Sequence, residues 1–147
     1  MLDESDLQDY VSEVVRDPVQ TLHNHSEAAR RLAMSGTNGF NLILRTMNCG
    51  WQSEAHPRDV IEALAYVLQQ IAQDDPIQLI RATEDPNIRP DPVLALLTWS
   101  LWNAAIHRRK NGHDIAEIIG ALKRLEAHPN ENVRFAATEG LKALALS

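Results

Sequence analysis

Residues 129–144 read Pro-Asn-Glu-Asn-Val-Arg-Phe-Ala-Ala-Thr-Glu-Gly-Leu-Lys-Ala-Leu, and this stretch carries the clearest structural signal in the chain. Its apolar residues recur at helical spacing and form one stripe along about four turns: Val133, Ala137, Leu141 and Leu144. A proline interrupts any preceding helix but is tolerated in a first turn. The stretch therefore predicts a proline turn followed by an amphipathic helix.

The same apolar spacing occurs twice more, upstream in the chain. One set is Val60, Leu64, Leu68 and Ile71, and the other is Val93, Leu97, Leu101 and Ala104. The first residues of the three sets are 33 and 40 positions apart, and prolines precede each set. Periods of this length indicate a repeat protein whose units stack on one another.

A shorter amphipathic segment precedes each stripe, at residues 40–49, 76–83 and 114–126. Asp114 followed three positions later by Glu117 is typical of an N-cap with its capping-box partner. Each unit is therefore predicted to be a helix pair, and no segment has the alternation of a strand. We expect one domain over residues 1–147, with helix pairs at 39–72, 76–106 and 114–146 and a degenerate capping pair at 1–38.

The final segment resembles the HEAT repeat family. It has that family's proline turn, its Val133-Arg134 and Ala136-Ala137 pairs, and its Leu-x-x-Leu ending. The resemblance extends from Phe40 to the end of the chain and implies an all-α fold, an α-α superhelix of about four helix pairs. It also implies a scaffold for protein binding, which is an analogy at the level of the fold. Ile61 and Leu94 replace the family's arginine, so a continuous arginine ladder between repeats is not expected.

Charge and composition narrow the classes of partner. The net charge is −6, and residues 1–17 hold six acidic side chains against one arginine. An acidic chain repels phosphate backbones, which disfavours nucleic acid, and it favours a basic protein partner. The longest apolar stretch, residues 93–106, is too short to span a membrane. The single cysteine, Cys49, and the absence of a leader-like start favour the cytoplasm.

A candidate binding surface lies opposite the three stripes, because each residue of a helix turns by about 100°. The predicted concave face carries four aromatic residues with a polar rim: Tyr66, Trp99, Trp102 and Phe135, with Glu62, Gln69, Glu139 and Lys142. Aromatic side chains ringed by polar ones are typical of binding hot spots. Trp102 is predicted to be the anchor, flanked by Gln69 and Lys142. The alternative is that residues 93–106 form a central helix buried on both sides.

The remaining patterns do not indicate catalysis. His23 and His25 would point about 200° apart on a helix, so no metal site is predicted, and neither is a cofactor. The basic residues 107–113 are either a phosphate or acidic-partner site or a solvated loop that complements a helix C-terminus. We therefore expect a non-catalytic protein–protein interaction module. Its contact surface is the concave aromatic face or the acidic N-terminal helix, as in an immunity or antitoxin-like inhibitor. The alternatives are a small HEAT-like enzyme or lyase, or a nucleic-acid-processing domain.

Overall fold

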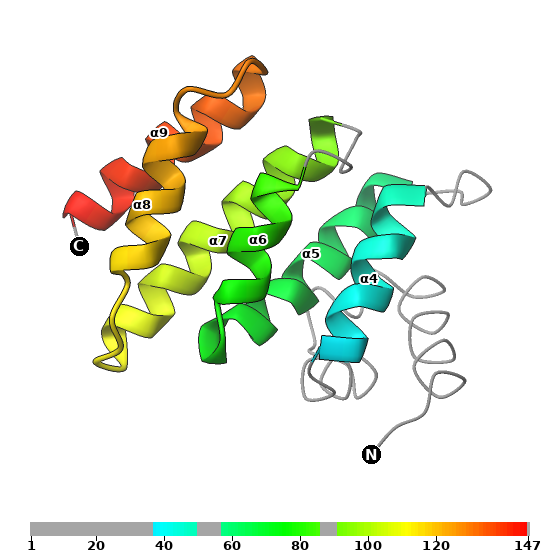
Figure 1. Cartoon of the computed structure of the whole chain (residues 1–147), viewed down its shortest axis with the longest axis horizontal. Coiled ribbons are helices and arrows are strands. Elements are labelled where there is room, and N and C mark those ends of the chain that lie inside the picture. Colours follow the sequence, from blue (N-terminus) through cyan, green and yellow to red (C-terminus); the bar gives the residue numbers. More distant parts are fainter. Residues whose placement is uncertain (1–36, 50–56, 86–90, 147) are drawn as a thin grey trace. The chain divides into compact units, whose positions relative to one another are not determined.

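The computed structural model describes residues 37–49, 57–85 and 91–146, and within these ranges every regular element is an α-helix. Figure 1 shows the six helices, which are α4 (Thr37–Cys49), α5 (Pro57–Asp74), α6 (Ile77–Glu84), α7 (Asp91–Lys110), α8 (Ala116–Leu125) and α9 (Glu131–Leu146). The predicted all-α fold class is confirmed for this part of the chain. The capping pair predicted within the first 38 residues, including the acidic first helix, falls on residues 1–36 and so lies outside the described residues.

The chain divides into two compact units, residues 1–71 and residues 72–147. In the first unit, α4 buries Phe40, Leu42, Ile43 and Met47, which belong to the amphipathic segment predicted at residues 40–49. Helix α5 buries Leu64, Leu68 and Ile71 of the first predicted stripe, whereas the side chain of Val60 lies outside the described residues. Apolar side chains at this spacing leave water together because they share one face of a helix.

The second unit consists of two layers of helices, α6 with α8 and α7 with α9 (Figure 1). Helix α7 packs against α6, α8 and α9. It buries all four residues of its predicted stripe, Val93, Leu97, Leu101 and Ala104. In α9, Val133, Ala137 and Leu144 are buried as predicted, whereas Leu141 is half-buried. Leu141 lies at the edge of the stripe, about 80° from Val133 on the helix.

Short polar side chains set the starts of three helices. Asp75 Oδ1 accepts the N–H of Ile77 at 3.2 Å, and Asp114 Oδ1 accepts the N–H of Ala116 at 3.1 Å. Asn130 Oδ1 accepts from the backbone of Asn132 and Val133 at 2.9 and 3.2 Å, which makes Asn130 the N-cap of α9.

The prediction of a capping box at Asp114 and Glu117 is wrong, because α8 begins at Ala116 and its N-cap is Ile115. The side chain of Asp114 forms a local turn with Ala116, as aspartate commonly does ahead of a helix. The N-cap of α8 is therefore Ile115, one residue after the predicted N-cap Asp114.

Helix α7 ends in a Schellman motif built on Gly112. The N–H of Gly112 donates to the carbonyl of Arg109 at 3.0 Å, and that of His113 donates to the carbonyl of Arg108 at 2.9 Å. Gly112 has a φ of 80°, a conformation that residues with a Cβ adopt only at a cost. This motif reverses the chain between α7 and α8.

Among the described helices, none has a stretch of the length and hydropathy that crossing a membrane requires.

Candidate functional site

Three of the four aromatic residues of the predicted face come together on α7 and α9. The ring centroids of Trp99 and Trp102 are 5.1 Å apart with an interplanar angle of 52°. The centroids of Trp99 and Phe135 are 6.4 Å apart in an edge-to-face arrangement with an angle of 62°. Both distances fall in the range in which aromatic rings attract each other. Trp99 therefore links the other two rings, and we call these three residues the aromatic cluster.

Trp102 forms the inner end of the cluster and packs against the backbone of α9. A Cβ built on Gly140 would lie 2.6 Å from Cγ and Cδ1 of Trp102 and 2.8 Å from its Cβ. Only glycine permits such an approach. The Trp102 side chain is half-buried, and its Nε1 is buried without an acceptor in the described part of the chain. The partner-binding role of Trp102 stays a prediction, and its present contact is with α9.

Phe135 forms the outer end of the cluster and faces solvent. Its side chain is 57% exposed, and it is the one large apolar residue in the described ranges with this degree of exposure. Lys142 lies on the same side of α9, exposed, with its Nζ 3.7 Å from a carboxylate oxygen of the half-buried Glu139. The cluster thus presents an exposed phenyl ring that is backed by an indole and bordered by one charge of each sign.

The other predicted rim residues lie on α5 in the first unit. Glu62, Tyr66 and Gln69 are each half-buried. They share one side of α5, as residues at spacings of four and three do. The two units are distinct, so the continuous face from Tyr66 to Phe135 stays a prediction.

The arginines of the basic turn bind the ends of other helices. Arg108 Nη1 donates to the carbonyls of Gln73 and Asp74, in the last turn of α5, at 3.0 and 3.2 Å. Arg109 Nη1 donates to the carbonyl of Leu144, in the last turn of α9, at 2.5 Å. Cations at helix C-termini satisfy carbonyls that the helix leaves unpaired and oppose its dipole. These contacts favour the structural interpretation of residues 107–113 over the anion-site interpretation.

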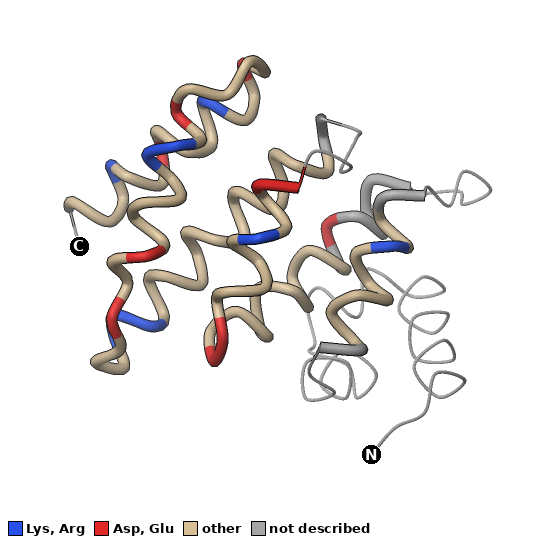
Figure 2. Tube along the Cα trace, viewed as in Figure 1, with Lys and Arg blue, Asp and Glu red and all other residues tan. Residues whose placement is uncertain are grey.

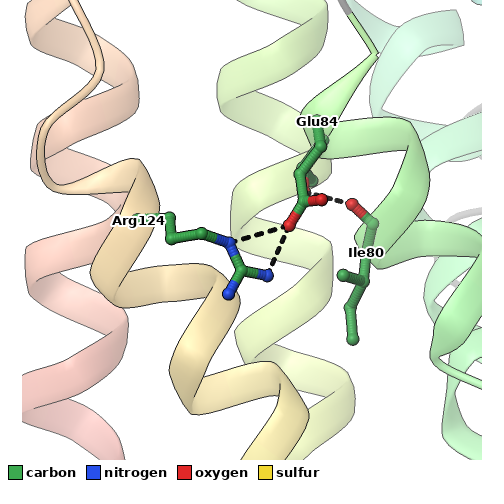
Figure 3. Close-up of polar contacts among 4 residues, drawn as sticks. Ile80, Glu84 and Arg124 are labelled. Atoms are coloured by element: carbon green, nitrogen blue, oxygen red, sulfur yellow. Dashed lines mark hydrogen bonds and ion pairs between the residues drawn. The ribbon is translucent and has the colours of Figure 1, made fainter.

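Two further arginines make contacts within the second unit. Arg124 of α8 reaches Glu84 of α6, and its Nε donates to Glu84 Oε1 at 3.0 Å (Figure 3). Both side chains are largely exposed, so this pair contributes at most about 1 kcal/mol. Arg134 Nη1 donates to the carbonyls of His128 and Pro129 in the turn before its own helix. Its contacts therefore stabilise the proline turn.

In α7, no Lys, Arg, Asp or Glu stands between its first residue, Asp91, and the basic residues of its last turn, whereas charged residues are spread along α8 and α9 (Figure 2). Within the described ranges, no group of three or more His, Cys, Asp or Glu side chains could hold a metal ion. His23, His25 and His56 lie outside these ranges. The aromatic cluster combines one exposed, supported ring with a neighbouring ion pair of Glu139 and Lys142.

Comparison of the chain with protein-family models, with curated protein sequences and with solved structures finds no match.

Sequence reasoning missed Gly140 and the carbonyl-binding roles of Arg108 and Arg109. A glycine in the middle of a helix lowers stability by about 1 kcal/mol relative to alanine. Its presence in a helical pattern therefore indicates a position where another segment packs closely. Nothing in the local pattern indicates the two arginine contacts, because Arg108 and Arg109 are 35 positions away from Gln73 and Leu144 respectively.

Proposed function

We propose that this chain is a non-catalytic protein-binding module, a HEAT-like α-α solenoid that contacts its partner through the aromatic cluster. The observation that carries the proposal is Phe135, 57% exposed and supported edge-to-face by Trp99. Full burial of a phenylalanine side chain is worth about 1.5–3 kcal/mol, and a ring that stays 57% exposed forgoes roughly half of this. A partner that covered the ring would recover this free energy.

The support beneath Phe135 favours a binding role over a chance exposure. Trp99 contacts both Phe135 and Trp102, and Trp102 is packed against Gly140. The phenyl ring therefore sits on a rigid base, which lowers the entropy lost when a partner covers it. Glu139 and Lys142 beside it provide the polar rim that excludes water from a hot spot.

A second contact surface rests on the sequence alone. Residues 1–17 carry six acidic side chains and one arginine, a charge density that accelerates association with a basic protein. An inhibitor of the immunity or antitoxin type, acting in the cytoplasm, is the version of the proposal that uses this segment. Its partner is a basic protein.

The proposal is tested by placing a photo-crosslinking benzoyl-phenylalanine at position 135 in cells. The same residue at position 117 on α8, where Glu117 is exposed, is the control. We expect a discrete protein adduct at position 135 and none at position 117. Phe135→Ala should change the free energy of unfolding by no more than about 0.5 kcal/mol while weakening the captured interaction by about 2 kcal/mol or more. Absence of any adduct at position 135 would refute the proposal.

A further inference from the structure

The outer side of α9 has a second regular spacing, opposite its buried stripe. Glu131, Phe135, Thr138 and Lys142 follow one another at intervals of four, three and four residues, which is the seam spacing of a coiled coil. Glu131 and Lys142 are exposed, Phe135 is 57% exposed and Thr138 is half-buried. Helix α9 packs against α7 and α8, and at the edges of this outer side Phe135 contacts Trp99 of α7 and Thr138 bonds to Glu126. We call Glu131, Phe135, Thr138 and Lys142 the α9 seam.

We infer that the α9 seam packs antiparallel against the α9 seam of a second copy of this chain, across a two-fold axis. This inference rests on the proposed function, because it names the protein that covers Phe135. A two-fold interface must be self-complementary, since each surface meets itself in reverse order. In the antiparallel register of coiled coils, Phe135 lies opposite Thr138 of the partner subunit. The same register places Glu131 opposite Lys142 of the partner subunit.

Charge complementarity selects a second copy as the occupant. The acidic end of the seam meets the basic end of the other copy, and two-fold symmetry repeats this pair at the opposite end of the interface. The Lys142 side chain is 66% exposed, and its contact with Glu139 is a loose one at 3.7 Å. Lys142 can therefore turn toward Glu131 of the partner subunit without losing a strong interaction.

The centre of the seam can be buried without leaving a polar group unpaired. Each residue of a helix rises by 1.5 Å, so the two Phe135 rings would lie about 4.5 Å apart along the axis. Trp99 supports each ring from behind. The hydroxyl of Thr138 donates to Glu126 Oε2 at 3.2 Å, so it has its hydrogen bond before the second copy arrives.

The size of the seam sets the expected strength of the dimer. One face of a 16-residue helix is a small interface, below the roughly 1,200 Å² of total buried area that stable complexes need. We therefore expect dissociation constants of about 10–100 µM, as for weak and transient pairs. The measurement must accordingly extend to several hundred micromolar protein.

Sedimentation velocity of the full chain tests the inference through charge reversal. Glu131→Lys and Lys142→Glu each place like charges at both ends of the interface, so each should raise the dissociation constant about tenfold or more. An equimolar mixture of the two variants restores opposite charges at both ends. The mixture should therefore form a heterodimer, with a dissociation constant within about threefold of the wild-type value. Its recovery also shows that both variants are folded.

The control variants are Glu117→Lys and Lys123→Glu on α8, which make the same changes of net charge at exposed positions outside the seam. Both should dimerise like the wild type. A wild-type chain that stays monomeric at several hundred micromolar, or a mixture that does not recover association, overturns the inference. In either case a crosslink from position 135 to a different protein leaves the proposed function standing. The absence of every crosslink removes the proposed function as well.

Discussion

Replacement of Gly140 by alanine tests the packing that supports the aromatic cluster. The new Cβ would lie 2.6 Å from Cγ and Cδ1 of Trp102 and 2.8 Å from its Cβ. Carbon atoms in contact prefer separations of about 3.5–4.0 Å, so the two groups must move apart by roughly 1 Å. Rotation of the indole cannot relieve the contact, because the Cβ of Trp102 is attached to the backbone of α7. Helices α7 and α9 must therefore separate.

The magnitude follows from two opposing terms. Overpacking of this kind costs about 1–3 kcal/mol, and we expect the upper end because backbone has to shift. Alanine in a helix interior recovers about 1 kcal/mol relative to glycine. The net loss for Gly140→Ala should therefore be about 2 kcal/mol.

Gly120→Ala on α8 is the matched control. Its Cβ would meet only Arg124 Nη1, at an ordinary contact distance of 3.6 Å. The helix term then acts alone, and the free energy of unfolding should rise by about 0.5–1 kcal/mol. Urea unfolding followed by the helical circular-dichroism signal measures both variants. A comparable denaturant slope for the two would show that only stability has changed.

A double-mutant cycle identifies Trp102 as the source of the cost. Trp102→Ala removes the Cγ and Cδ1 atoms that conflict with the new methyl group but keeps the Cβ at 2.8 Å, so it relieves most of the conflict and not all of it. The loss caused by Gly140→Ala should then shrink by about 1–2 kcal/mol in the Trp102→Ala background. If Gly140→Ala is as stable as Gly120→Ala in the wild-type background, Trp102 does not pack on α9 and the cluster has no rigid base.

Substitutions at four other positions test separate parts of the second unit. Gly112→Ala should lower the free energy of unfolding by about 1–2 kcal/mol, because the φ of 80° is strained for alanine even though the space around Gly112 is open. Gly112→Asn should cost less, since asparagine tolerates this conformation better. Equal stability of the wild type and both variants in urea would contradict the Schellman geometry. Arg109→Ala should cost about 1–2 kcal/mol by leaving the carbonyl of Leu144 without its charged donor, whereas Arg124→Ala should cost at most about 1 kcal/mol; thermal unfolding of the two side by side decides the ranking. Ala137→Leu should cost about 1–3 kcal/mol, because Ala137 is fully buried. An unchanged unfolding midpoint would mean that the buried face of α9 is assigned incorrectly.

The spacing of apolar residues in the sequence was enough to predict the described helices and most of their buried faces. Val93, Leu97, Leu101 and Ala104 are buried because their spacing puts them on one face, and this spacing is visible in the sequence. Pro57 likewise stands at the first position of α5, and Pro129 lies between α8 and α9, since proline cannot continue a preceding helix. The start of α8 was displaced because aspartate can form a turn as readily as a cap, and the two have the same sequence signature.

Which aromatic residue faces solvent depended on how the helices pack. Trp99, Trp102 and Phe135 all lie opposite the buried stripes of their helices, and their spacing does not distinguish them. Helix α9 covers Trp102 because Gly140 allows its backbone to come close, and this contact leaves Phe135 at the outer edge. Periodicity reports which residues share a face of one helix. Whether a second helix covers that face depends on contacts between residues far apart in the chain, here Trp102 and Gly140, and local periodicity does not encode them.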